Sequence, residues 1–270
     1  MSEPKVLRYS DAELRDPVAI IGFPTVGLVG SILAGLMVRE MNLPVVAGVT
    51  AADLPPYTFV TDGRPYPQIR IFGGTPPRIK RKKKTEGEEE QTEAPKEVPA
   101  PKRKRSKPRD LVIVTSEIAP KPEQTYDITL SIMSVLRDLG VTDIICLEGA
   151  SGPSAEAPVV GVSGNETADA LLKQTEVESM GDGIVRGISG IMLMEGSHGG
   201  FNVMSLLVPA NPQLPDPRAA ARLAGPIADM YPRFRVDTDP LYKEAEEIDA
   251  RIRAQQAQQA MQGGGEGFYG

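Results

Sequence analysis

Runs of four to six apolar residues recur along the chain, and most of them are bounded by glycine, proline or charged residues. Short apolar runs rich in β-branched residues are typical of buried β-strands. We therefore predict strands over residues 18–21, 45–50, 68–72, 111–115, 143–147, 159–162 and 203–208.

Between several of these runs, apolar residues recur every three or four positions, as on one face of an α-helix. The predicted helices cover residues 26–38, 123–139, 167–173, 187–195 and 216–230. Alternating strands and helices favour a mostly parallel or mixed sheet with helices on both faces. The pattern predicts a three-layer α/β/α sandwich over residues 1–238, in which residues 1–16 are a polar lead-in.

The first strand and helix, Val18 to Val38, are predicted to be the unit on which the rest of the domain is organised. Gly22 and Pro24 break the chain between the strand and the helix. Small residues then recur at helical spacing, which puts them on one face and lets the helix pack closely. These small residues are Gly27, Gly30 with Ser31, and Ala34 with Gly35.

A phosphate loop and a membrane span are two further interpretations of this stretch, and both have less support than a buried core. Gly22 and Gly27 have the spacing of a phosphate loop, but Leu28 and Val29 stand where such a loop needs Lys and Ser or Thr. Residues 17–38 carry no charge and have about the length of a membrane span, ~20 residues. The Gly-Phe-Pro-Thr break argues against one continuous membrane helix.

A charged insert over residues 76–109 interrupts the α/β pattern. Residues 78–109 hold 13 lysines and arginines and six glutamates, a net charge of +7, which leaves −13 for the rest of a chain whose net charge is −6. Because large apolar residues are almost absent, we expect the insert to be disordered. We prefer a solvated insertion between two strands to a nucleic-acid contact, because no aromatic residue interleaves the lysines.

The C-terminal region is predicted to be a helix over residues 239–262 followed by a flexible tail, residues 263–270. The helix carries a short heptad seam of Leu241, Ala245, Ile248 and Ile252. Packing back onto the domain and projecting as a self-associating helix both stay open. Glycines at the start of the tail free its last three residues, Phe268, Tyr269 and Gly270.

Candidate chemistry is sparse. The single histidine, His198, follows Ser197, but neighbours in sequence rarely face one another as a catalytic pair must. The loop Glu148 to Ser154 follows a strand, where α/β sheets bind ligands. Asp237 and Asp239 resemble a metal clamp, and helix capping by Asp239 is the simpler interpretation. We expect no catalytic residues, no metal and no cofactor.

Composition limits the disulfides, the cellular location and the nucleic-acid binding that we expect of this chain. One cysteine, Cys146, excludes an internal disulfide, and its apolar neighbours predict a buried thiol. The chain does not open with a basic and then apolar leader, so we expect a cytoplasmic protein. Tryptophan is absent and aromatic residues make up 5%, which leaves little to stack on nucleobases.

Three segments resemble a known family. Gly22 to Gly30, Leu54 to Tyr57 and Leu147 to Pro153 look like archaeal proteins related to the second eukaryotic proteasome assembly chaperone. The similarity covers about residues 15–235 without the insert. It implies a three-layer fold similar to nucleoside phosphorylases, a homo-oligomer that is a tetramer or pentamer, and no established catalysis.

The resemblance also implies a function for the tail. Phe268-Tyr269-Gly270 matches the hydrophobic-Tyr-any tripeptide with which proteasome activators and chaperones dock between α-subunits, with the free carboxylate as part of the ligand. The favoured hypothesis is an assembly chaperone or activator that binds the α-ring of the proteasome core particle. The alternative is a nucleoside phosphorylase or hydrolase with a pocket near Glu148 to Pro153 and His198.

Overall fold

A computed structural model describes residues 3–77, 108–152, 154 and 156–263 of the chain. Its centre is a nine-stranded sheet in the order β1-β3-β6-β7-β2-β8-β11-β9-β10, and β4 and β5 form a separate hairpin. The strands are β1 (Lys5–Arg8), β2 (Val18–Gly22), β3 (Val45–Thr50), β4 (Phe59–Thr61), β5 (Arg64–Tyr66), β6 (Ile69–Gly74), β7 (Leu111–Ser116), β8 (Asp143–Ala150), β9 (Val160–Ser163), β10 (Glu178–Ser179) and β11 (Asn202–Pro209).

The middle of the sheet is parallel and its flanks are antiparallel. Strands β7, β2, β8 and β11 run in parallel, whereas β1, β3 and β6 pair in antiparallel fashion on one side and β9 does so against β11 on the other. The sheet is therefore mixed. Strands β2 and β7 are buried along their whole length, as expected of strands covered on both faces.

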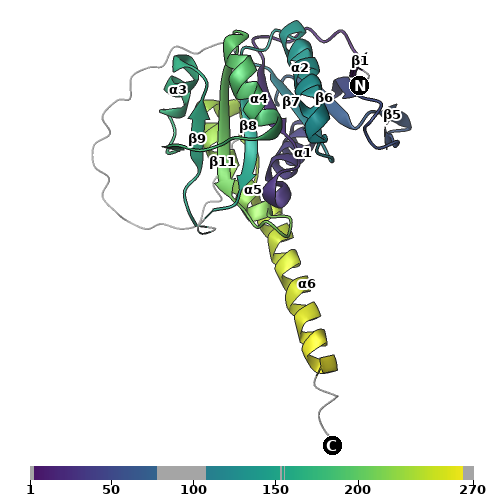
Figure 1. Cartoon of the computed structure of the whole chain (residues 1–270), viewed down its shortest axis with the longest axis vertical. Coiled ribbons are helices and arrows are strands. Elements are labelled where there is room, and N and C mark those ends of the chain that lie inside the picture. The colour runs from purple at the N-terminus through teal and green to yellow at the C-terminus, as the bar shows by residue number, and fades with distance from the viewer. Residues whose placement is uncertain (1–2, 78–107, 153, 155, 264–270) are drawn as a thin grey trace, which may run out of the picture.

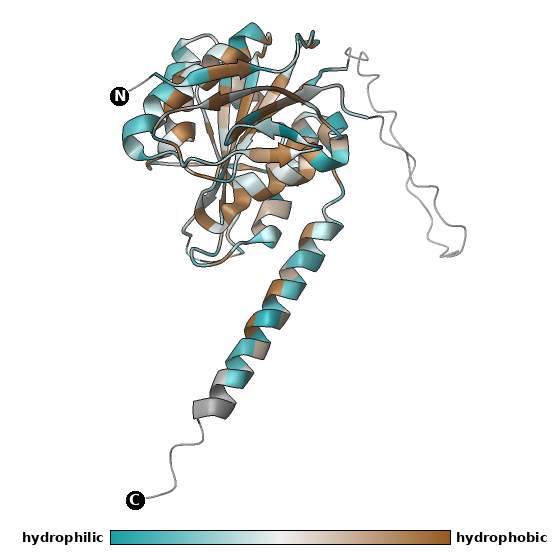
Figure 2. Cartoon of the chain, turned by 90° about the vertical axis from the view of Figure 1, so that its right-hand side faces the viewer, coloured by the Kyte–Doolittle hydropathy of each residue, from teal (hydrophilic) through white to brown (hydrophobic). Residues whose placement is uncertain are grey.

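Helices cover both faces of the sheet, which gives the predicted α/β/α layers (Figure 1). One apolar core lies between the sheet and α1, α3 and α5, and a second lies between the sheet and α2 and α4. In Figure 2 the apolar residues concentrate in the strands and on the inner helix faces. The bounds are α1 (Val29–Met41), α2 (Pro122–Asp138), α3 (Glu166–Leu172), α4 (Gly187–Ile191), a π-helical turn (Met192–Gly196), α5 (Pro217–Met230) and α6 (Asp239–Gly263).

Helix α1 packs against the sheet through the predicted small residues, with one correction. A Cβ built on Gly30 would lie 2.6 Å from the carbonyl oxygen of Leu147, and one on Gly22 would lie 2.6 Å from the Cβ of Ala34. Neither position accepts a side chain, so α1 and the sheet are in backbone contact there. Gly35 is different: a Cβ at that position would meet only Arg39, at 3.5 Å.

Four strands were missed by the sequence pattern. Residues 1–16 are not only a lead-in, because β1 lies in them at the edge of the sheet. All four residues of β1 are exposed, so the strand has neither an apolar run nor an alternating pattern. The hairpin β4–β5 and the two-residue β10 are also largely exposed, and for the same reason they lack a signal.

The charged insert connects two neighbouring antiparallel strands, β6 and β7. Gly74 pairs with Leu111 at the end of this ladder. The Thr75 hydroxyl donates to a carboxylate oxygen of Asp110 at 2.7 Å, which closes the connection next to the sheet. The predicted disorder concerns residues 78–107, which lie outside the described part of the chain.

Helix α6 lies on α5 at its start and then extends away from the body (Figure 1). Leu241 and Ala245 of the predicted seam are buried, and Ile248 and Ile252 are half-buried. The rest of the helix is mainly hydrophilic (Figure 2). Within the described residues, no helix has the length and apolar character that crossing a membrane requires.

Candidate functional site

The expected loop site begins at Glu148 on β8, and the partner of this carboxylate lies on α4. Strand β8 runs to Ala150, so Glu148 lies near the end of the strand and the loop begins later than predicted. The Ser189 hydroxyl on α4 donates to the Glu148 carboxylate. Burial raises the pKa of Glu148 to about 7, although the Ser189 hydrogen bond opposes the shift. Sequence reasoning missed Ser189, because it lies in an apolar helix 41 residues away.

The glycine-containing turn between β2 and α1, residues 22–27, packs directly against other parts of the chain. The Gly149 amide donates to the Thr25 hydroxyl at 2.9 Å, and a Cβ on Gly149 would lie 1.8 Å from the carbonyl oxygen of Val26. The Asp216 amide donates to the Gly27 carbonyl at 2.8 Å. These contacts use the turn for packing between β2, β8 and the start of α5, in agreement with its prediction as a core element.

Ser197 and His198 point to different neighbours. The Nδ1 atom of His198 lies 2.7 Å from the carbonyl oxygen of Met194. A Cβ on Gly164 would lie 1.8 Å from the Ser197 hydroxyl oxygen, so the serine faces β9 and the start of α3. His198 itself is exposed in a groove of about 380 Å³ with Leu130, Met133, Arg137, Glu195 and Gly199. Serine and histidine therefore do not form a nucleophile–base pair.

Glu148 and His198 lie at opposite ends of the parallel strands. Ser189 contacts Glu148 at the carboxyl end of β8. His198 comes nine residues later along the same helical segment, a rise of ~13 Å at 1.5 Å per residue. Shortly after it, the Asn202 amide donates to the Thr142 carbonyl at 2.8 Å, at the amino end of β8. The two segments proposed for an enzyme pocket do not converge.

The Asp237–Asp239 pair forms a local turn. The Asp239 amide donates to a carboxylate oxygen of Asp237 at 3.1 Å, so Asp237, and not Asp239, supplies the accepting side chain. Among the described residues, no group of three or more His, Cys, Asp and Glu side chains could hold a metal ion. Cys146 is fully buried, and burial raises the pKa of its thiol, as expected of an inert cysteine.

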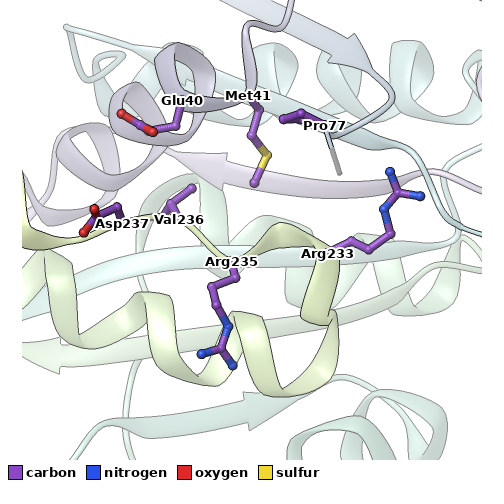
Figure 3. A pocket seen from close by; sticks show the side chains of 7 residues that line it. All are labelled: Glu40, Met41, Pro77, Arg233, Arg235, Val236 and Asp237. Carbon is purple, nitrogen blue, oxygen red and sulfur yellow. The ribbon is translucent and has the colours of Figure 1, made fainter. Parts of the chain in front are cut away.

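Asp237 also borders a small cavity of about 150 Å³ at the root of the insert (Figure 3). The carboxylates of Glu40 and Asp237 lie on one side of it, and the Arg233 side chain lies on the other (Figure 3). Arg233 donates to the carbonyl oxygen of Pro76 at 2.5 Å. The arginine thus holds the chain where it leaves β6, which is a structural contact.

A buried polar network lies at the amino ends of the parallel strands, and the sequence pattern did not indicate it. Asp143 is 4% exposed and forms an ion pair with Arg109. It also accepts hydrogen bonds from the Tyr231 hydroxyl at 2.9 Å and the Asn202 amide nitrogen at 2.6 Å. Burial, followed by the nearby Asp143 charge, raises the pKa of Tyr231. The network ties β7, β8, β11 and the end of α5 together.

Helix α6 leaves the body beside the carboxyl ends of the parallel strands. An arginine nitrogen of Arg218, at the start of α5, lies 2.8 Å from a carboxylate oxygen of Asp249 on α6. The helix then continues to Gly263. The predicted docking residues Phe268, Tyr269 and Gly270 follow it in sequence and lie outside the described residues.

Comparison with known proteins gives consistent matches over nearly the whole chain. The structure is similar to two crystal forms of Pyrococcus furiosus PbaA, described as an archaeal homologue of proteasome-assembly chaperone. One form has a TM-score of 0.74 with 24% identity and covers 96% of this chain and 94% of that one. The other form has a TM-score of 0.70 with 25% identity and covers 94% and 97%.

Two further relatives match. Pyrococcus furiosus PbaB, described as an archaeal proteasome activator, has a TM-score of 0.72 with 18% identity over 95% of this chain and 100% of that one. An uncharacterised protein of Methanocaldococcus jannaschii, MJ0106, is 24% identical over 92% of this chain and 89% of its own length. The PAC2 family model matches residues 19–256, which include the covering helices, the first part of α6 and every strand of the sheet except β1 and the first residue of β2. The chain belongs to the PAC2 family.

Proposed function

We propose that this protein is a proteasome assembly chaperone or activator that binds the α-ring of the core particle through Phe268, Tyr269 and Gly270. Membership of the PAC2 family, together with the similarity to PbaA and PbaB, is the observation that carries the proposal. The projecting helix supports it, because a tail that follows α6 begins at a distance from the body (Figure 1).

The docking chemistry follows from these three residues. Tyr269 offers an apolar ring with a hydroxyl at its tip, which can fill a pocket and still find a hydrogen-bond partner. Phe268 adds apolar burial beside it, and a carboxylate at Gly270 pairs with a lysine of the α-ring. One tail binds weakly, since ordering a flexible segment costs free energy.

We propose that a homo-oligomer, a tetramer or pentamer, presents several tails to one α-ring. Linked tails bind at high effective concentration, so the assembly binds more tightly than a single tail if helix and tether span adjacent pockets. A catalytic role has less support, because Glu148 and His198 lie at opposite ends of the strands.

The test is surface plasmon resonance on immobilised proteasome core particle. We expect Tyr269→Ala, and equally one alanine appended after Gly270, to abolish binding while gel filtration shows an unchanged oligomer. Tyr242→Ala, at an exposed tyrosine on α6, is the matched control and retains binding. Unchanged binding by both tail variants would remove the tail from the mechanism.

A further inference from the structure

Strand β1 leaves one row of backbone groups open at the edge of the sheet. It pairs with β3 on one side, and within the described residues no strand pairs with its other side. The Tyr9 amide donates to the Val46 carbonyl at 2.9 Å, which continues the β1–β3 ladder. Because ladder bonds alternate in direction, Lys5 and Leu7 also bond towards β3. The N–H and C=O groups of Val6 and Arg8 therefore point outward.

Apolar side chains border this open edge. Val6 and Leu7 are each 38% exposed, and they lie on opposite faces of the sheet. Tyr9, 40% exposed, lies against Tyr66 of the β4–β5 hairpin with 5.0 Å between ring centroids. Tyr66 pairs with Phe59 across the hairpin, and the Phe59 ring lies 5.5 Å from that of Tyr57. An open strand edge and a row of aromatic rings are thus adjacent.

We propose that β1 pairs in antiparallel fashion with β1 of a second copy of this chain, about a two-fold axis at Leu7. In this register, Val6 of each copy lies opposite Arg8 of the other, and the two residues exchange their outward N–H and C=O bonds. Leu7 lies opposite Leu7 as a pair without hydrogen bonds, in which side chains approach closely. The two sheets become one continuous sheet.

The pleat, one proline and the charge of Arg8 select this register. Two residues that lie opposite each other in adjacent strands have their side chains on the same face of the sheet. The two-fold axis must therefore pass through a residue of β1 and not between two residues. An axis at Val6 would place Pro4 opposite Arg8, and proline has no N–H to donate. An axis at Arg8 would place the Arg8 residues of the two copies opposite each other and Val6 opposite Ser10, whose N–H already bonds to the Val46 carbonyl at 3.4 Å. The axis at Leu7 instead uses the outward N–H and C=O groups of Val6 and Arg8.

The charges of β1 are compatible with pairing to a second copy. Lysines on edge strands commonly prevent such contacts, since like charges that meet across the interface are unfavourable. At the Leu7 axis, Lys5 lies opposite Tyr9 and Arg8 lies opposite Val6, so no two cations meet. Arg8 is also neutralised by its own Asp138 on α2. The edge is therefore self-complementary in chemistry as well as in register.

This interface goes beyond the proposed function and does not depend on the tail. An isologous two-fold contact builds even-numbered assemblies, so it either forms part of the proposed tetramer or joins two pentamers into one particle. If tail variants lose proteasome binding, the β1 contact is unaffected, and if the β1 contact fails, tail docking stands on its own test. The two proposals can therefore fail separately.

Engineered cysteines test the axis. In the proposed pair the Cα atoms of the two Leu7 residues are about 4.5 Å apart, within the range for a disulfide. The two Lys5 residues are four positions out of register, so their Cα atoms are about 14 Å apart. We expect oxidised Leu7→Cys to migrate as a covalent dimer on non-reducing gels and Lys5→Cys to remain monomeric. The native Cys146 is buried and contributes no background.

Val6→Pro is the second test, because it removes only an outward N–H and keeps the β1–β3 ladder. We expect light scattering to show half as many chains per particle for Val6→Pro, and the parental number for Val6→Thr. Thermal unfolding checks that both variants fold. The proposal is overturned if Leu7→Cys cross-links no better than Lys5→Cys. It is also overturned if Val6→Pro keeps the parental mass. The open edge of β1 would then pair with an extended segment of another protein or stay exposed to solvent.

Discussion

At the scale of single residues, the carboxylates of Asp143 and Glu148 differ in what surrounds them. Asp143 has an arginine, a tyrosine hydroxyl and an amide as partners, so its charge is compensated. Glu148 has one hydroxyl donor, and burial raises its pKa. The Glu148 carboxylate is therefore the group from which a pH dependence of stability is expected.

We predict that Glu148→Gln flattens the pH dependence of folding stability. The pKa of Glu148 rises from 4.5 to about 7 on folding. Between these values the Glu148 carboxylate binds more protons in the folded than in the unfolded state, so its contribution to stability is largest below pH 4.5 and falls as pH rises to about 7. The loss is on the order of 2 kcal/mol, since one pKa unit is 1.36 kcal/mol and Glu148 is partly exposed to screening.

Urea unfolding at several pH values measures this effect. Glu148→Gln should be more stable than the parent at pH 8, with the difference vanishing near pH 4.5. Glu156→Gln, at an exposed carboxylate, is the matched control and should follow the parent curve. A difference between Glu148→Gln and the parent that does not change with pH would contradict the prediction.

At the scale of elements, helix α1 depends on positions where no side chain fits. A Cβ on Gly30 would lie 2.6 Å from the Leu147 carbonyl oxygen and 2.9 Å from that of Phe23. Both obstacles are backbone atoms of the sheet and the turn, which cannot move aside as a flexible side chain can. The close approach of α1 is thus a property of the interface and not only of helix composition.

We predict that Gly30→Ala destabilises the protein by ~1–3 kcal/mol, the usual cost of overpacking. Gly35→Ala on the same helix is the matched control. Its new methyl would meet only Arg39, at 3.5 Å, and alanine is favoured over glycine in a helix by about 1 kcal/mol. Chemical unfolding should therefore shift in opposite directions for the two variants, and a shift in the same direction would refute the assigned packing of α1.

At the scale of the whole molecule, the charged insert and helix α6 leave the α/β body at different places. The insert begins and ends next to the β6–β7 ladder, near the amino ends of the parallel strands. Helix α6 leaves near their carboxyl ends. Because the ladder is closed by Thr75 and Asp110, the body does not rely on residues 78–107 for its sheet.

We predict that replacing residues 78–107 by a short glycine–serine linker leaves the melting temperature and the oligomer unchanged. A shorter closed loop costs slightly less entropy, so a small rise is compatible with this expectation. Differential scanning calorimetry and light scattering provide the measurement. A large fall in melting temperature would mean that the insert packs against the body.

The pattern of apolar residues by itself determined the main strands and helices, because each of them buries a continuous run or a stripe. It also determined the layer arrangement, since alternating elements must cover a sheet on both faces. Small residues at helical spacing correctly predicted the close packing at Gly30 and Ala34, though not the position of Gly35. The family resemblance came from the same glycine-rich segments and was confirmed by the family match.

Only the tertiary structure decided which polar groups meet. Ser189 reaches Glu148, and Arg109 reaches Asp143, across 41 and 34 residues of sequence, and no local pattern encodes contacts between such distant residues. The separation of Glu148 from His198 was likewise decided by strand direction, which places them at opposite ends of the sheet. Strand β1 has no pattern because it is exposed on both faces, and its open edge becomes visible only once β3 is in place beside it.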